Sequence, residues 1–359
     1  MRVLMLTTSA SLMDGINRHI LAISSGLQAR GVEVCVCVVH SQGDFIAALR
    51  NAGVEVCSLG CKNGHSLRIP LRFARVMNDF NPDVVHVHVL AFMERLVLST
   101  LFSRVKVVQT IHGISDPVSS RTWRQRVANL LERVFDVRIA RRAFVSNGVR
   151  RAFGGGADND LTIYNPVGIH HSGRSTLRQE LGVPDSVNIV GTACRIASVK
   201  NPLAFTRVIR EVTKRITGSH GVVIGDGDPV LMGELKKLVA DSPNVHLLGY
   251  RTDAQQLIAG LDCFVMTSMR EGMPTAVLEA MVAGVPIVFW KGEGGLVDLA
   301  ELSASELAFG VAVDRGDERA MIDAVCRTMR NGEKTEGESV VERFFSVSRI
   351  TDQLMELYG

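Results

Sequence analysis

Short apolar segments rich in β-branched residues alternate with amphipathic helical segments along most of the chain, and this alternation constrains the fold more than any other feature. Strands that alternate with helices predict an α/β protein with parallel sheets. In the first half, the predicted strands are 3–7, 32–39, 54–59, 83–89, 105–110 and 143–146. The helix after the first strand has Ile16, Ile20, Ile23 and Leu27 on one face. This half is therefore predicted to be a Rossmann-like, doubly wound domain.

The alternation is interrupted once and then resumes. The segment from Tyr164 to Gly168 has the composition of a turn and no periodicity, so it predicts a domain boundary. The chain ends in an amphipathic segment with Ile350, Leu354 and Leu357 at helical spacing. The predicted domains are residues 1–168 and 169–343, followed by a terminal helix over 344–359. The strands predicted in the second half are 187–193, 221–224, 245–248, 261–266, 285–289 and 309–313.

Length, charge and hydropathy exclude several classes of protein. The chain has 359 residues, enough for two domains of ordinary size, and its net charge of +3 does not indicate nucleic acid as the partner. The N-terminal segment lacks the longer apolar region of a signal peptide. No apolar run reaches the roughly 18 residues needed to span a bilayer. We expect a cytoplasmic protein.

Cofactor and metal signatures are weak in this sequence. The turn after the first strand, residues 9–15, lacks the Gly-x-Gly-x-x-Gly pattern that cradles a dinucleotide, which disfavours NAD. Of the seven cysteines, Cys57 and Cys61 have the spacing that zinc sites favour. His86 and His88 alternate at a strand end, where they are expected to pack or to line a cleft. We therefore predict that the protein needs no metal and no other cofactor.

The segment at 269–286, MREGMPTAVLEAMVAGVP, combines two carboxylates with a helix start that follows a strand. Pro274 fits the first helical position, and the free N–H groups near Thr275 would face a phosphate. Glu271 and Glu279 are eight positions apart, so they can meet two ends of a ligand that lies over the helix start. A sugar nucleotide has hydroxyls at both ends and phosphates between them. The segment therefore indicates a nucleotide-sugar site.

This segment resembles the E-x7-E signature of the retaining glycosyltransferases of family 4. The matching positions are Glu271-Gly272-x-Pro274, then Glu279-Ala280-Met281, then Gly284-x-Pro286. The resemblance implies the α/β GT-B fold, in which two Rossmann-like domains with doubly wound parallel sheets face each other across a cleft. It also implies that the acceptor binds mainly to the first domain and the donor to the second. The terminal helix would cross back to the first domain.

The resemblance further implies roles for individual residues. Arg195 and Lys200 would bind the donor diphosphate and neutralise the charge on the leaving phosphate. Cys194 stands where the family usually has a glycine before this arginine. Glu271 would bind hydroxyls of the donor sugar and Glu279 the ribose diol. The implied catalytic residues are Glu271, His112, Arg195 and Lys200, and the implied donor-binding residues also include Gly15, Gly272, Met273, Pro274, Thr275 and Glu279.

The first long helix begins at a second matching position. Gly15 matches a family glycine that allows the backbone to approach a phosphate or an acceptor, although the family commonly has Gly-Gly where this chain has Asp14-Gly15. Asp14 can instead cap the helix. The contribution of this helix start to acceptor binding is therefore left open by the sequence.

The expected function is transfer of a hexose or N-acetylhexosamine from a UDP-sugar to a lipid-linked or glycan acceptor in surface polysaccharide synthesis. The Tyr-Asn-Pro-Val run at 164–167 resembles hexosamine-transferring relatives. Two other classes stay open. One is a UDP-sugar 2-epimerase of the same fold, and the other is a noncatalytic protein that binds nucleotide sugars.

The most basic stretch of the chain, residues 121–151, bears on the acceptor. It contains nine arginines against Glu132 and Asp136, with Trp123, Val127 and Leu130 among the apolar residues at helical spacing. One interpretation is an interfacial helix that binds an anionic membrane, and the other is a core-facing helix with solvated arginines. Arginine density favours the first. We therefore expect peripheral contact with the inner face of the plasma membrane and a lipid-linked acceptor.

Overall fold

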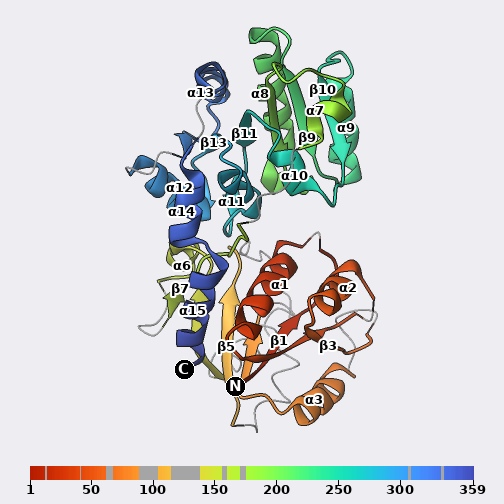
Figure 1. The fold of residues 1–359 in the computed structure, drawn as a ribbon, viewed down its shortest axis with the longest axis vertical. Coiled ribbons are helices and arrows are strands. Elements are labelled where there is room, and N and C mark those ends of the chain that lie inside the picture. Colours follow the sequence, from red (N-terminus) through yellow and green to blue (C-terminus); the bar gives the residue numbers. More distant parts are fainter. Residues whose placement is uncertain are drawn as a thin grey trace, which may run out of the picture. The chain divides into compact units, whose positions relative to one another are not determined.

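The computed structural model describes residues 1–12, 14–40, 42–61, 68–88, 104–114, 138–155, 160–169, 175–305, 309–332 and 335–359. These residues form two compact units, each with its own sheet (Figure 1). The first unit contains Met1–Pro166 together with Val347–Gly359, and the second contains Val167–Ser346. The boundaries lie within three residues of those expected from the sequence.

The first unit is built on a parallel sheet with the strand order β3-β2-β1-β4-β5-β6-β7. Strand β6 begins at Ile139, earlier than the predicted start at residue 143, because Arg141 and Arg142 are part of the strand. The other predicted strands of this half are confirmed to within two residues at either end. The strand bounds are β1 Arg2–Thr7, β2 Glu33–Val38, β3 Glu55–Ser58, β4 Val84–Val87, β5 Lys106–Ile111, β6 Ile139–Phe144 and β7 Leu161–Thr162.

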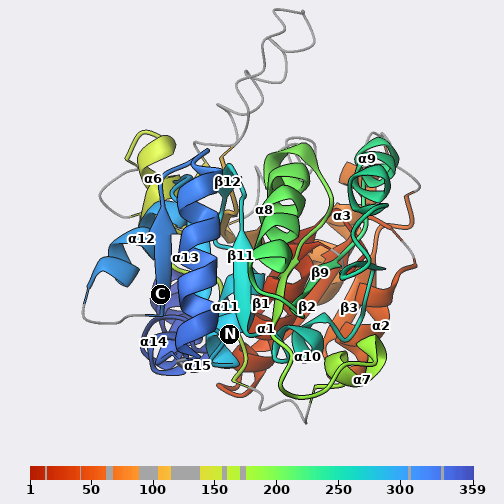
Figure 2. The same ribbon diagram turned by 90° about the horizontal axis from the view of Figure 1, so that it is seen from above.

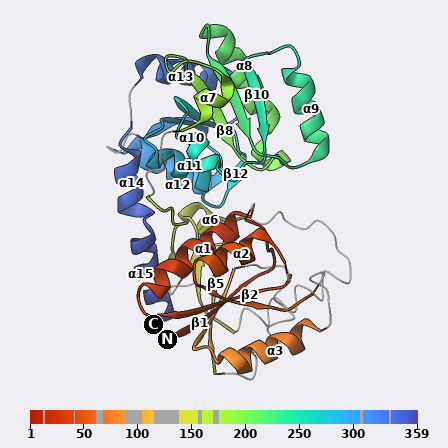
Figure 3. The same ribbon diagram turned by 45° about the vertical axis from the view of Figure 1, so that its right-hand side comes forward.

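Helices cover both faces of this sheet. Alternate residues of a strand point to opposite faces. Accordingly Val3 and Met5 of β1 belong to one apolar cluster, with helices α1, α2 and α15, while Leu4 and Leu6 belong to another, with α3. Figure 3 shows α3 on the opposite side of the sheet from α1 and α2. The helix bounds are α1 Gly15–Gln28, α2 Asp44–Asn51, α3 Ile69–Phe80, α6 Asn147–Ala152 and α15 Val347–Tyr358.

The C-terminal helix α15 packs on α1, which confirms the predicted return of the chain to the first domain. A Cβ added at Gly26 of α1 would overlap the hydroxyl of Thr351, so the two helices approach closely at this glycine. At the end of α15, Lys106 Nζ donates to the carbonyl of Tyr358 at 3.0 Å. Arg141 Nη1 donates to the carbonyl of Glu356 at 2.8 Å. These cations satisfy carbonyl groups that the helix itself leaves free.

The second unit has a parallel sheet with the strand order β10-β9-β8-β11-β13-β15, and a separate pair β12-β14. From β8 the chain first builds outward through β9 and β10 and then returns to the other side of β8 with β11. The order therefore reverses between β8 and β11, the place where open α/β sheets bind ligands. The strand bounds are β8 Ile189–Ala193, β9 His220–Ile224, β10 Val245–Gly249, β11 Cys263–Met266, β12 Arg270–Glu271, β13 Ile287–Trp290, β14 Glu293–Gly294 and β15 Gly310–Val313.

Helices α8 and α13 lie side by side on one face of this sheet (Figure 2). They bury Val265 of β11 and Val288 of β13 in a shared apolar cluster. In the described part of the chain, no helix combines the length and the apolar character needed to cross a bilayer. The bounds are α7 Leu177–Leu181, the 3-10 helix η1 Ser198–Lys200, α8 Pro202–Arg215, α9 Pro229–Val239, α10 Ala254–Ile258, α11 Thr275–Val282, α12 Gly295–Ala304, α13 Glu318–Asn331 and α14 Gly337–Phe344.

Candidate active site

The segment 269–286 folds in the predicted order of strand, loop and helix. Strand β11 ends at Met266, Glu271 follows in the short strand β12, and α11 begins at Thr275. The prediction that Pro274 occupies the first helical position is wrong by one residue. Pro274 is the N-cap, with φ −76° and ψ 106°, because its extended backbone turns the loop into the helix. The first-turn N–H groups near Thr275 remain available at the helix start.

Glu271 and Lys200 form a buried ion pair in the second unit. Lys200 Nζ lies 2.6 Å from both carboxylate oxygens of Glu271. The Glu271 side chain is 7% exposed and that of Lys200 is 21% exposed. A carboxylate this deeply buried needs a compensating cation. The structure thus brings together two predicted site residues that are 71 positions apart, although the sequence did not predict that they pair.

Two loops are tied together to hold this pair. The Thr267 hydroxyl donates to the carbonyl of Asn201 at 3.0 Å, and the Met269 amide donates to the carbonyl of Val199 at 2.9 Å. Asn201 adopts a left-handed conformation with φ 49°, which turns the chain from η1 into α8. Both loops leave the sheet at the switch point between β8 and β11. Their hydrogen bonds hold together the two segments that carry Lys200 and Glu271.

Arg195 is the second residue after β8 and has an exposed side chain. The backbone on either side of it packs against a turn that contains Gly225 and Gly227. A Cβ added at Gly225 would overlap the carbonyl of Cys194, and one added at Gly227 would overlap that of Ile196. Burial raises the pKa of the Cys194 thiol to about 12, so it stays a neutral thiol beside Arg195. Cys194 therefore replaces the family glycine without adding a charge.

A second helix start, which the sequence analysis missed, lies beside the first. Strand β12 pairs with β14, placing Glu271 opposite Gly294, and α12 begins at Gly295. A Cβ added at Gly295 would overlap the carbonyl of Gly272 and lie 3.0 Å from Cα of Met273. Only glycine permits this approach. The signal in the sequence was the glycine cluster Gly-Glu-Gly-Gly at 292–295.

The remaining predicted donor residue of this unit is Glu279. It lies in α11, one helical turn after Thr275, and its side chain is partly buried. Arg195, Lys200, Glu271 and Glu279 therefore all belong to the second unit. Gly15 and His112, the other predicted site residues, belong to the first unit.

In the first unit, Asp14 caps α1. Its carboxylate accepts a hydrogen bond from the Ile16 amide at 3.0 Å. Gly15 is the first residue of the helix, and a Cβ there would meet no atom within 4 Å. Packing among the residues that the structure describes therefore does not require a glycine at this position. A close approach of a ligand to the backbone is the reason that the family resemblance offers for it.

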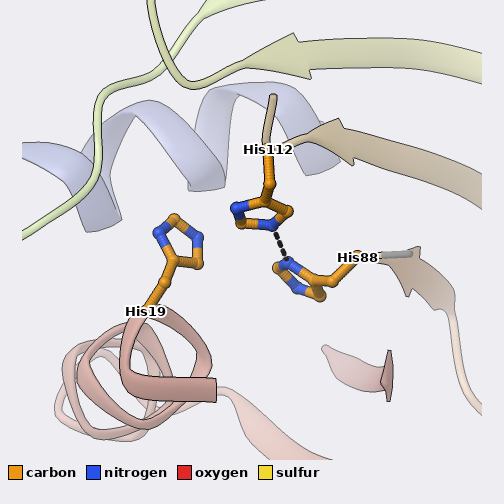
Figure 4. A group of neighbouring side chains, drawn as sticks. All are labelled: His19, His88 and His112. Carbon is orange, nitrogen blue, oxygen red and sulfur yellow. Dashed lines mark hydrogen bonds between the residues drawn. The ribbon is translucent and has the colours of Figure 1, made fainter. Parts of the chain in front are cut away.

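His112 follows β5 and lies in a cluster of histidines that the sequence did not predict as a group (Figure 4). Its Nε2 is 3.0 Å from Nδ1 of His88, which follows β4. The ring of His19, from α1, lies edge-on to that of His112 with centroids 4.9 Å apart. The sequence analysis did not identify His19 as a candidate site residue. The feature that could have indicated it is its position among the buried isoleucines of the first helix.

Burial keeps the cluster neutral. Burial lowers the pKa of His19 to about 4, and the side chain of Asn165 opposes part of that shift. The pKa values of His88 and His112 are held well below the usual range, mainly by burial and then by the neighbouring histidines. All three imidazoles are therefore uncharged at neutral pH.

His86 has a structural role. It is fully buried, with Nδ1 2.7 Å from the hydroxyl of Tyr358 and Nε2 2.7 Å from that of Thr110. Both ring nitrogens are thus occupied. This arrangement fits the prediction that His86 packs in the core, and it ties the end of α15 to β4 and β5.

The cysteines do not pair as their spacing suggested. The Sγ of Cys57 contacts the Sγ of Cys35 on the neighbouring strand at 2.8 Å, while Cys61 donates to the carbonyl of Leu59. Cys35, Glu55 and Cys57 place their ligand atoms within 4.8 Å of one another. The hydrogen bond to Cys57 and burial both raise the pKa of the Cys35 thiol. The same hydrogen bond lowers the pKa of Cys57, so a zinc ion, which binds the thiolate, would have to displace the proton held by Cys35.

The part of the basic stretch 121–151 that holds the apolar residues of the predicted interfacial helix, residues 121–137, lies outside the described residues, so membrane contact stays a prediction. Two arginines later in the basic stretch have partners within the first unit. Arg141 donates to the end of α15, and the guanidinium of Arg142 lies 5.6 Å from the ring centroid of Phe153. These two side chains contribute to the packing of the unit.

The chain is similar to known glycosyltransferases along most of its length. The family model Glycosyltransferase Family 4 matches residues 13–170, and Glycosyl transferases group 1 matches residues 187–331. The chain is 29% identical over 181 residues to the UDP-Gal:alpha-D-GlcNAc-diphosphoundecaprenol alpha-1,3-galactosyltransferase of Escherichia coli, a match that covers 46% of this chain and 43% of that protein. It is 24% identical over 318 residues to the N-acetyl-alpha-D-glucosaminyl L-malate synthase of Bacillus anthracis, covering 82% of this chain and 79% of that one.

Among solved structures, Anabaena Alr3699/HepE in complex with UDP and glucose superposes with a TM-score of 0.82. The match has 22% sequence identity and covers 99% of this chain and 98% of that chain. This likeness and the two Rossmann-like units define the fold class as GT-B. With both halves matched by family models, the chain belongs to glycosyltransferase family 4. The predicted fold class and family are confirmed.

Proposed function

We propose that the protein is a retaining glycosyltransferase that moves a hexose or N-acetylhexosamine from a UDP-sugar to a lipid-linked or glycan acceptor. The observation that carries this proposal is the buried Lys200–Glu271 pair at the switch point of the second sheet, where Arg195 follows β8 and α11 begins four residues after Glu271. A cation, a carboxylate and free helix N–H groups at one sheet edge match the phosphates and hydroxyls of a sugar nucleotide.

The ion pair allows Lys200 to have two roles. An ammonium group has three N–H donors. Two of them serve the oxygens of Glu271, so the third is free to donate to a phosphate oxygen. Glu271 thereby orients Lys200 toward the diphosphate while its own remaining lone pairs accept from sugar hydroxyls. Arg195, exposed after β8, supplies a second cation for the charge that grows on the leaving phosphate.

No residue in this arrangement is assigned as a nucleophile. In the proposed reaction, the acceptor hydroxyl attacks from the face that the nucleotide leaves, and its proton passes to the departing phosphate oxygen. Stabilisation of the leaving group then supplies most of the rate acceleration. The names of the relatives support the substrate classes, since the Escherichia coli protein is named for a UDP-galactose donor and a diphosphoundecaprenol-linked acceptor.

A donor screen followed by a transfer assay tests this function. We expect one UDP-sugar among UDP-GlcNAc, UDP-GalNAc, UDP-Glc and UDP-Gal to raise the melting temperature most, because a ligand that binds only the folded state stabilises it. That donor should be transferred to a diphosphate-lipid-linked sugar. NMR should show the same anomeric configuration in the donor and in the product, with the anomeric proton equatorial in both. Conversion of the free donor without acceptor would indicate an epimerase. Binding without transfer or hydrolysis would indicate a noncatalytic protein.

Transfer is expected to proceed without an added metal ion. Arg195, Lys200 and the positive end of α11 would perform the charge neutralisation for which other enzymes use a divalent cation. Treatment with EDTA, followed by its removal, should leave the initial rate intact. A requirement for Mn²⁺ or Mg²⁺ that spermidine cannot replace would contradict this prediction.

A further inference from the structure

Three histidines from separate elements of the first unit converge on one point. His19 comes from α1, His88 follows β4 and His112 follows β5, and each offers a ring nitrogen within 4.8 Å of the others. Figure 4 shows the three imidazoles gathered around one space. In the first sheet the strand order reverses between β1 and β4, so the cluster lies at the switch point of this sheet as well.

Three ring nitrogens in this cluster make no hydrogen bond of normal geometry to any residue in the described part of the chain. His19 is 2% exposed, and although Asn165 lies near enough to influence its pKa, neither ring nitrogen makes a hydrogen bond of normal geometry to a residue that the structure describes. His88 is 1% exposed, and its Nε2 also lacks one. A buried polar atom without a partner costs free energy, so such atoms call for an explanation. His86 has a partner at both nitrogens, which shows that burial alone does not leave a histidine unsatisfied here.

The donor set selects the kind of ligand. Three neutral imidazoles offer nitrogen lone pairs to a cation, and the cluster contains no carboxylate. Imidazole nitrogen suits Zn²⁺, Co²⁺, Ni²⁺ and Cu²⁺, whereas Mg²⁺ and Ca²⁺ require oxygen ligands. Three histidines with a fourth, exchangeable ligand form a known kind of zinc site.

The distances are also close to those of a metal site. The Nδ1 of His88 and the Nε2 of His112 are 3.0 Å apart. Two ligands of a tetrahedral zinc ion, each about 2.0–2.1 Å from the metal, lie about 3.3 Å apart. An opening of about 0.3 Å would bring this pair to the spacing of two zinc ligands, and the nitrogen of His19, within 4.8 Å of both, would have to move toward them to complete the site. The proton that the pair shares would move to the other nitrogen of the same ring, so each imidazole stays neutral.

We propose that His19, His88 and His112 form a binding site for a divalent transition metal of the Zn²⁺ type, with a fourth position left for water or another ligand. This site is separate from the donor residues of the second unit. If the proposed function holds, a metal here would engage His112, the residue that the family resemblance places near the donor sugar. Because a bound ion would occupy His112, it should inhibit transfer. The metal is therefore proposed as an inhibitor and not as a cofactor of the reaction.

Cobalt titration tests the site without any enzymatic readout. The full-length protein, first treated with a chelator and then freed of it, is titrated with Co²⁺ while the visible ligand-field absorption is recorded. We expect about one equivalent of Co²⁺ to bind and to give the spectrum of a four-coordinate, nitrogen-rich site. Zn²⁺ should displace the bound Co²⁺, and Mg²⁺ should not. His19→Gln and His112→Gln should each weaken binding by at least about 100-fold, because the loss of a ligand exceeds the loss of an outer-shell contact.

Two controls use other groups in the same chain. His220 and His246 form another histidine pair, with Nδ1 and Nε2 2.9 Å apart, so His220→Gln measures the effect of losing an unrelated histidine. Cys35→Ser tests the group formed with Glu55 and Cys57. Both variants should bind Co²⁺ as the wild type does. The proposal would be overturned if the wild type gave no cobalt spectrum. It would also be overturned if Cys35→Ser lost the spectrum while a folded His112→Gln protein kept it.

Because His19 is buried, its substitution can reduce stability. Far-ultraviolet circular dichroism and the melting temperature of each variant establish that it is folded before titration. His112 is the less buried of the ligands, so His112→Gln provides the second variant. Since no nucleotide sugar is present, failure of the metal proposal and failure of the glycosyltransferase proposal give separate results.

Discussion

Arg195→Ala is expected to slow sugar transfer by about a hundredfold or more while leaving the melting temperature unchanged. Arg195 is exposed after β8 and makes no ion pair with any residue that the structure describes. Its removal therefore takes away a charge that is proposed to stabilise the leaving diphosphate, and because the side chain is exposed it should disturb little packing. Steady-state kinetics with the best UDP-sugar measure the effect. Arg207→Ala, which breaks an exposed pair with Glu318 in the same unit, is the matched control and should keep wild-type turnover.

Lys200→Ala should slow transfer to a similar extent but also lower the free energy of unfolding. It leaves the carboxylate of Glu271, 7% exposed, without its cation. Removal of one partner of a buried ion pair costs about 3–5 kcal/mol, and urea unfolding measures the loss. The double variant Lys200→Ala/Glu271→Gln removes the uncompensated charge, so it should recover stability without recovering the rate. Wild-type turnover in both Arg195→Ala and Lys200→Ala would show that the diphosphate binds elsewhere.

Glu271→Gln and Glu279→Gln are expected to differ in which kinetic constant they change. Glu271 is proposed to contact the donor sugar and to orient Lys200, both of which matter as the bond breaks. Loss of a hydrogen bond to a charged group, about 1.5–3 kcal/mol, corresponds to a decrease in kcat of about ten- to a hundredfold. Glu279, proposed to bind the ribose, contributes equally to ground and transition states. Its replacement should mainly raise the KM for the donor.

Binding of UDP alone separates these roles from a general loss of structure. UDP has the ribose and the diphosphate but no sugar, so Glu279→Gln should weaken UDP binding, measured by calorimetry. Glu271→Gln should weaken UDP binding less than Glu279→Gln does, because UDP lacks the sugar that Glu271 is proposed to contact and only the orientation of Lys200 is affected. Identical kinetic profiles for the two variants, or weaker UDP binding in Glu271→Gln alone, would contradict the assignment.

The sequence was sufficient to predict features that depend on local pattern. Continuous apolar segments such as 3–7 became strands covered on both faces, and the isoleucines of α1 became its buried face. These patterns are readable because a strand or a helix that buries a face must repeat apolar residues at its own period. The predicted strand bounds were less accurate where contacts with distant parts of the chain hold polar residues in a strand. Strand β6 extends over Arg141 and Arg142, which have polar side chains that the strand pattern would not select.

The sequence alone determined the family, the order of strands and helices, and the residues near Glu271 that indicate a nucleotide-sugar site. Tertiary structure decided which of these residues meet. The Lys200–Glu271 pair joins loops 71 positions apart, and the histidine cluster draws His19 from a helix that carried no predicted site residue beyond Gly15. Such contacts arise because parallel strands distant in sequence end at the same edge of a sheet. Periodicity within one segment contains no information about its neighbour across that edge.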